Sequence, residues 1–139
     1  DLEEFFKHSQ VGQFLVQLYD AVVHELKHQA QGRSRNYLPN PYIVDLESTA
    51  SYLSDPDEID AYALSIAIEL IRNLGRTRSI QYLHRASRLA NVRPKGLYAS
   101  PNLFAYFKTF EHLDHPVIRK LLKKVFLNLE TVDKMAVFY

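Results

Sequence analysis

The sequence predicts a mainly α-helical fold in a single domain. Its 139 residues are a length typical of one domain, and 47% of them are hydrophobic and 24% charged, as in ordinary globular proteins. In several stretches the apolar residues recur every three or four positions, which is the periodicity of an amphipathic helix. No apolar run approaches the roughly 18 residues that a membrane-spanning helix needs. We expect at most one short strand, at residues 42–44.

The first long helix is predicted from Val11 to about Gln31. Successive residues turn by about 100° around a helix, so the apolar and polar residues of this segment fall on opposite sides. The apolar stripe contains Val11, Leu15, Leu18, Val22 and Leu26. The polar side contains Gln13, Gln17, Asp20, His24, His28 and Gln31. Gly32 is the predicted end of the helix, because glycine is common just after a last turn.

Residues 32–54 contain two prolines and are predicted to form a loop. A second long helix follows, with Asp55 capping its first turn and Pro56 at its first helical position. It is expected to end near Gly75. The residues of this helix that we expect to face the core are Ala61, Leu64, Ala67 and Ile71.

Three further helices complete the predicted fold. They cover about residues 77–90, 100–111 and 116–129, where apolar residues again follow helical spacing. Proline and glycine near residue 95 end the first of the three.

The net charge of +1 conceals an uneven distribution of charge. Residues 1–69 contain 12 acidic and four basic residues, whereas residues 70–110 contain eight basic residues, from Arg72 to Lys108, and no acidic one. Either the two blocks pack together, or the basic segment binds an anionic partner such as a nucleic acid. No nucleic-acid-binding motif accompanies the basic segment, and both interpretations stay open.

Residues 24–28 read HELKH, which is an HExxH motif. His24 and His28 are four positions apart and therefore share one face of a helix, where both imidazoles can reach a single zinc ion. Glu25 then lies near a metal-bound water, from which it can take a proton. The alternative is that the two histidines are solvated surface residues of an amphipathic helix.

A catalytic zinc takes three protein ligands and leaves one position for water. Thirty residues after His28, the next helix contains the pattern E-x-x-A-x-A, beginning at Glu58. Together the two motifs resemble the gluzincin branch of the HExxH metallopeptidases, in particular small members and the HtpX-like and ImmA/IrrE-like families. The resemblance covers about 45 residues, from His24 to Leu70. It implies that His24, His28 and Glu58 bind zinc and that Glu25 is the general base.

Other assignments of the third ligand stay open. Asp60 is the rival to Glu58, although it lies about 200° away around the same helix. Glu47, in the predicted loop, is a more distant option. Glu58 also occupies the third helical position after Asp55, where a capping-box glutamate would bond back to the start of the helix.

Tyrosines could assist the predicted site. Four residues after Glu58, where the resembling families often have an aspartate that supports a ligand histidine, this chain has Tyr62. Tyr62 shares a face with Glu58 and could supply a phenol beside the metal. Tyr37, Tyr42 and Tyr52, in the predicted loop, could instead offer a phenol to a developing oxyanion.

The sequence therefore predicts a zincin-like helical domain with its metal site within residues 24–58 and a basic, helical half at 72–139. The predicted function is a zinc-dependent metallopeptidase acting on a polypeptide substrate. The alternative is a non-catalytic helical assembly or nucleic-acid-binding component. Zincins usually place a strand beside the cleft, so we expect either a sheet in a segment upstream of Asp1 or an all-helical variant. The absence of cysteine and of a visible signal peptide favours a cytoplasmic location.

Overall fold

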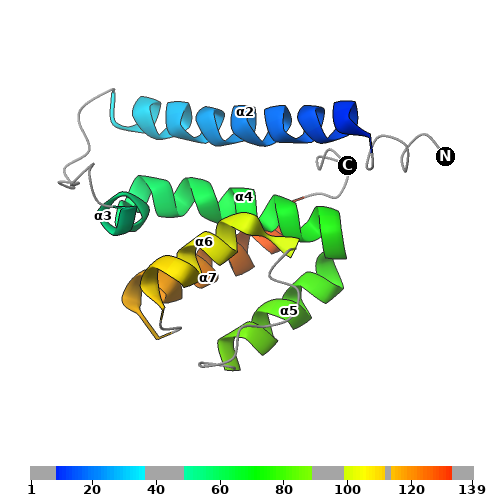
Figure 1. Cartoon of the computed structure of the whole chain (residues 1–139). Helices are drawn as coiled ribbons and strands as arrows, with labels where there is room; N and C mark the ends of the chain where they lie inside the picture. Colours follow the sequence, from blue (N-terminus) through cyan, green and yellow to red (C-terminus); the bar gives the residue numbers. More distant parts are fainter. Residues whose placement is uncertain (1–8, 37–48, 89–98, 112–113, 133–139) are drawn as a thin grey trace.

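The computed structural model describes residues 9–36, 49–88, 99–111 and 114–132. These residues form six α-helices and no strand, which confirms the predicted mainly α fold class. In chain order the helices are α2 (Gln10–Ser34), α3 (Thr49–Ser54), α4 (Pro56–Leu74), α5 (Arg76–Arg88), α6 (Pro101–Phe110) and α7 (Pro116–Thr131) (Figure 1). In the part of the chain that the structure describes, no helix has the length and apolar character needed to span a membrane.

The bounds of α4 follow from its capping residues, as predicted. The Asp55 side chain accepts a hydrogen bond from the backbone N–H of Asp57 at 2.9 Å, and Pro56 opens the helix. At the other end, Gly75 has a φ of 77° and its N–H donates to the carbonyl oxygen of Ile71. Glycine adopts this left-handed conformation without steric cost, so the helix ends there.

Two predictions about the segment after the first helix were wrong. The helix continues past Gly32 to Ser34, and Arg35, the residue after its last turn, forms an ion pair with Asp57 of α4 at 2.7 Å. Residues 32–54 are also not loop throughout, since α3 occupies Thr49–Ser54. The predicted strand at 42–44 lies outside the described residues.

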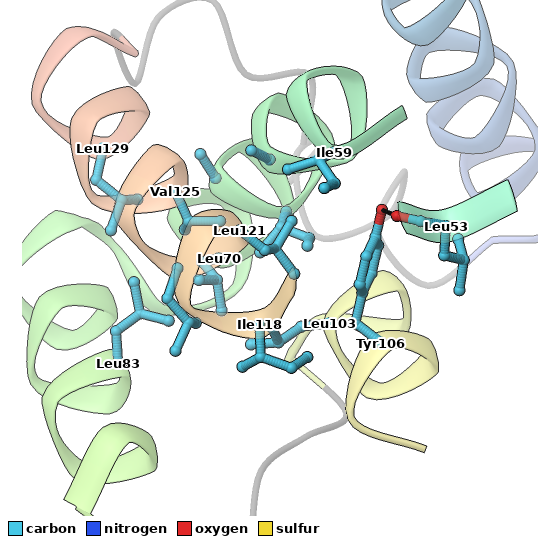
Figure 2. Close-up of a cluster of buried hydrophobic side chains, with 14 of the residues drawn as sticks. Leu53, Ile59, Leu70, Leu83, Leu103, Tyr106, Ile118, Leu121, Val125 and Leu129 are labelled. Atoms are coloured by element: carbon cyan, nitrogen blue, oxygen red, sulfur yellow. Dashed lines mark hydrogen bonds between the residues drawn. The ribbon is translucent and has the colours of Figure 1, made fainter. Parts of the chain in front are cut away.

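Helix α4 is the centre of the molecule and contacts each of the other five helices. One side of α4 faces α6 and α7, and the apolar side chains between them form the core (Figure 2). The Tyr106 ring of α6 is fully buried, and its hydroxyl donates to the carbonyl oxygen of Leu53 in α3 at 2.8 Å. The main core residues are Ile59, Ile66, Leu70, Leu83, Leu103, Tyr106, Ile118, Leu121, Val125 and Leu129.

Helix α2 lies along the other side of α4 and does not pack through its apolar stripe (Figure 1). Amphipathic helices ordinarily bury that stripe. Here the stripe is exposed, with Val11 at 64%, Leu18 at 49% and Leu26 at 55% of full exposure. From Asp20 onward the polar side faces α4 instead, where Gln31 is buried and Asp20 binds Arg72, whereas Gln13 and Gln17 are exposed. The side of α4 that faces α2 itself carries polar and charged side chains, and these pair with the polar side of α2.

Candidate metal centre

The side of α4 that faces α2 carries Glu58, Ser65 and Arg72. They are spaced seven residues apart, which is close to two helical turns, so they share one face. The Arg72 side chain is only 7% exposed, and its two terminal nitrogens donate to the Asp20 carboxylate at 2.6 and 2.9 Å. A guanidinium buried to this extent needs a paired anion. The polar side of α2 supplies that anion, and the two helices run antiparallel.

The same packing brings three potential metal ligands together. Glu58 Oε2 lies 3.4 Å from His24 Nε2, Glu58 Oε1 lies 3.0 Å from His28 Nε2, and the two Nε2 atoms are 3.2 Å apart. Among the described residues these three form a group that could hold a metal ion. Donor atoms at about 2.0–2.1 Å from a tetrahedral zinc would stand roughly 3.3 Å from one another. The two Nε2 atoms have this spacing, and with one donor atom taken from each of the three residues, all three lie within 4.8 Å of one another.

The charge state of Glu58 suits a cation. Burial raises the pKa of its carboxyl, but favourable interactions with His24, His28 and Tyr52 lower it further than burial raises it. The carboxylate is therefore the stable form. Its Oε2 atom is buried, and His24 Nε2, 3.4 Å away, is too distant to donate a strong hydrogen bond to it. A buried carboxylate oxygen without a close donor is costly unless a cation lies beside it.

Glu58 turns toward the two imidazoles and not back to the start of its helix. In a capping box, the glutamate would accept a hydrogen bond from the backbone N–H of Asp55. Here that N–H donates to the carbonyl oxygen of Tyr52 at 3.2 Å. Asp60, the rival ligand, is outside the three-residue group: its carboxylate pairs with Lys124 at 2.6 Å and with Lys27 at 3.5 Å. Glu47 lies outside the described residues.

Each histidine also contacts an uncharged side chain through its second ring nitrogen. His28 Nδ1 is 2.8 Å from Gln31 Oε1, and the Gln31 amide nitrogen donates to the carbonyl oxygen of Asp57 at 2.8 Å. His24 Nδ1 is 3.3 Å from the hydroxyl of Ser65. Sequence analysis did not assign a role to Gln31 or Ser65. Their spacing was the available signal, since Gln31 is three residues after His28 and Ser65 is seven after Glu58.

The group opens onto a pocket of about 420 Å³ between α2 and α4. Glu25 lines this pocket together with the three potential ligands and is itself exposed. Water and an incoming molecule can therefore reach Glu25 and the ligand group from the same side. This is the placement that a proton acceptor beside a metal requires.

Two tyrosines border the ligand group. The Tyr62 ring lies 4.6 Å from the His24 ring, centroid to centroid, and both line the pocket. Tyr52 of α3 lines it as well, and burial, its hydrogen bond with Tyr62 and the nearby Glu58 carboxylate raise the pKa of its phenol. Tyr52 therefore stays protonated and can donate a hydrogen bond. Tyr37 lies outside the described residues.

No family model, curated protein or solved structure matches this chain. A functional assignment therefore depends on the geometry of the ligand group and its pocket.

Proposed function

We propose that this chain is a zinc-dependent metallopeptidase, with His24, His28 and Glu58 as zinc ligands. The observation that carries the proposal is the convergence of two imidazole nitrogens, 3.2 Å apart, with one carboxylate whose two oxygens each lie 3.0–3.4 Å from one of those nitrogens. Two histidines and one glutamate are a donor set used by catalytic zinc sites of peptidases. When bound, zinc would polarise a peptide carbonyl and lower the pKa of a nearby water.

Glu25 is the proposed general base. Its side chain lines the pocket but is not part of the ligand group, so it is available to accept a proton. In hydrolysis the water oxygen bonds to the carbonyl carbon while Glu25 takes the proton from that water. Glu25 then gives the proton to the amide nitrogen as the carbon–nitrogen bond breaks.

Tyr52 is the described tyrosine best placed to donate to negative charge that develops on the carbonyl oxygen. It is protonated, lines the pocket and interacts with Glu58. Tyr62 is better placed to hold His24, because the two rings are in contact. These roles belong to the peptidase proposal and follow from the position of each ring.

Replacing Glu25 by glutamine tests the proposed activity. Glutamine is nearly isosteric, so the Glu25→Gln variant should bind as much zinc as the wild type while hydrolysing an unfolded test protein at least about 10²-fold more slowly. Glu130→Gln, an exposed position on α7, is the matched control and should keep full activity. Equal rates for the wild type and Glu25→Gln would contradict the role of Glu25. A zinc-loaded wild type without any hydrolysis would favour the non-catalytic alternative.

A further inference from the structure

The contacts of Gln31 determine which way its side-chain amide faces. The amide is in a residue only 9% exposed, and it lies between His28 of α2 and the backbone of α4. A carbonyl oxygen can only accept hydrogen bonds, so the group 2.8 Å from the carbonyl of Asp57 must be the amide nitrogen. The amide oxygen therefore faces His28.

This orientation fixes the position of the proton on His28. The Gln31 oxygen can only accept, so the ring nitrogen 2.8 Å away, Nδ1, must be the donor. In the neutral imidazole the proton is then on Nδ1, and Nε2 has a free lone pair. Nε2 is the atom that lies 3.0 Å from Glu58. The tautomer that Gln31 selects is thus the one needed to bind a metal at this point.

Ser65 lies beside the corresponding ring nitrogen of the other histidine, at 3.3 Å from His24 Nδ1. A serine hydroxyl has a single proton, and that of Ser65 is within reach of the carbonyl oxygen of Ala61 at 3.2 Å. When the proton is donated there, the Ser65 oxygen can accept from His24 Nδ1. The Gln31 contact is the shorter of the two.

We infer that Gln31 is a positioning residue of the metal centre, an inference that rests on the proposed function of the site. Its amide oxygen holds the ring of His28 and keeps the proton on Nδ1. Its amide nitrogen bonds to the residue that precedes Glu58, so one side chain sets the distance between ligands on two helices. Groups that orient ligand histidines in this way commonly change metal affinity by about 10- to 100-fold when they are removed.

Two substitutions separate the function of the amide oxygen from that of the whole side chain. Gln31→Met fills a similar volume but cannot accept from His28, and zinc affinity measured by competition with a chromophoric chelator should fall by about 10- to 100-fold. Gln31→Glu still offers an oxygen to Nδ1 but loses the donor to the Asp57 carbonyl, so its zinc affinity should fall by less than that of Gln31→Met. Gln29→Met, at an exposed position of the same helix, is the control and should leave the affinity unchanged.

Nitrogen-15 NMR of the His28 ring gives a reading that a purely structural role would not alter. In the wild type and in Gln31→Glu the ring should be the Nδ1–H tautomer with a slowly exchanging proton, and in Gln31→Met that proton should exchange faster. Unchanged affinity and exchange in Gln31→Met would overturn the inference. If the wild type binds no zinc, the proposed function fails. The His28 ring of the zinc-free protein then tests whether Gln31 positions it. An Nδ1–H proton that exchanges slowly in the wild type and faster in Gln31→Met supports this role, and equal exchange in the two contradicts it.

Discussion

On the side of α4 that faces α7, the contacts are between fully buried aliphatic side chains, whereas the side that faces α2 carries charged and hydrogen-bonding groups. The first interface includes Leu70 of α4 and Leu121 of α7, both with no exposed surface. The second holds the Arg72–Asp20 ion pair and the Glu58–histidine group.

The two sides of α4 therefore have different roles: one stabilises the fold and the other positions the potential metal ligands. Burial of apolar side chains supplies most of the stability of a folded chain. Polar contacts contribute less free energy, but their directions fix which atoms meet. Helix α4 is therefore anchored by its apolar side, and its polar side can present Glu58 at a defined position relative to His24 and His28.

The largest loss of stability is expected on the apolar side. Leu121→Ala should lower the free energy of unfolding by about 3 kcal/mol, because it removes a fully buried side chain and leaves a cavity between α4 and α7. Urea denaturation measures the change. Leu127→Ala, on the same helix but at a position 54% exposed, should have little effect. Equal losses at the two positions would mean that this interface is not the core.

A smaller loss is expected when the ion pair between α2 and α4 is broken. Asp20→Ala leaves the Arg72 guanidinium, 7% exposed, without its carboxylate and should cost about 2 kcal/mol. The cost is below that of a fully buried pair because Asp20 is 27% exposed. Adding Arg72→Met should restore part of the loss, since the double variant has no unpaired charge. A double variant no more stable than Asp20→Ala would contradict this account.

The two glutamates of α4 should give opposite pH effects. Burial raises the pKa of Glu69 above its ordinary 4.5, although Ser100 donates a hydrogen bond to its carboxyl. Its contribution to stability is therefore complete below pH 4.5 and is lost as pH rises through the folded-state pKa. The pKa of Glu58 is lowered, so its contribution is present above pH 4.5 and is lost as pH falls through its folded-state value.

Melting temperatures measured against pH test this contrast. Between pH 4.5 and neutrality, Glu69→Gln should remove part of the decline in stability that the wild type shows, because glutamine does not ionise. Glu130→Gln, which is exposed on α7, should retain the wild-type profile. A Glu69→Gln profile parallel to that of the wild type would show that Glu69 titrates at its ordinary value.

The smallest effect is expected at the exposed part of the basic segment. Arg78 and Arg85 are exposed on α5, and exposed ion pairs are worth under about 1 kcal/mol. Reversing both charges to glutamate should barely change the melting temperature, in contrast to Asp20→Ala. Salt-sensitive binding of single-stranded DNA by the wild type, lost in the double variant, would show that this segment binds anions.

Much of the fold could be predicted from local sequence signals. Asp55, Pro56 and Gly75 each act within a few residues of their own position, so the bounds of α4 follow without knowledge of the rest of the chain. The side of α2 that packs could not be predicted in this way. It depends on contacts with distant residues, such as that of Asp20 with Arg72, which is 52 positions away.

In the candidate site, too, some features could be predicted from local sequence and others depend on the packing of the helices. The HELKH spacing places His24 and His28 on one helix face, and the structure brings Glu58 to both. The contacts of Gln31 and Ser65 depend on the antiparallel packing of α2 on α4, which no local pattern determines. Tyr52 was considered only as one of several loop tyrosines, because the helix α3 that positions it was not predicted.

The central claim is that His24, His28 and Glu58 bind one zinc ion, and the most direct test is the metal content of the folded protein. Chelator-treated chain is reconstituted with zinc, passed through a desalting column and analysed by inductively coupled plasma mass spectrometry. We predict about one zinc per chain for the wild type and for His84→Ala, a histidine that packs against Phe126 outside the group. His28→Ala should retain almost none. A wild type without zinc, or a His28→Ala variant that retains as much as the wild type, would contradict the claim.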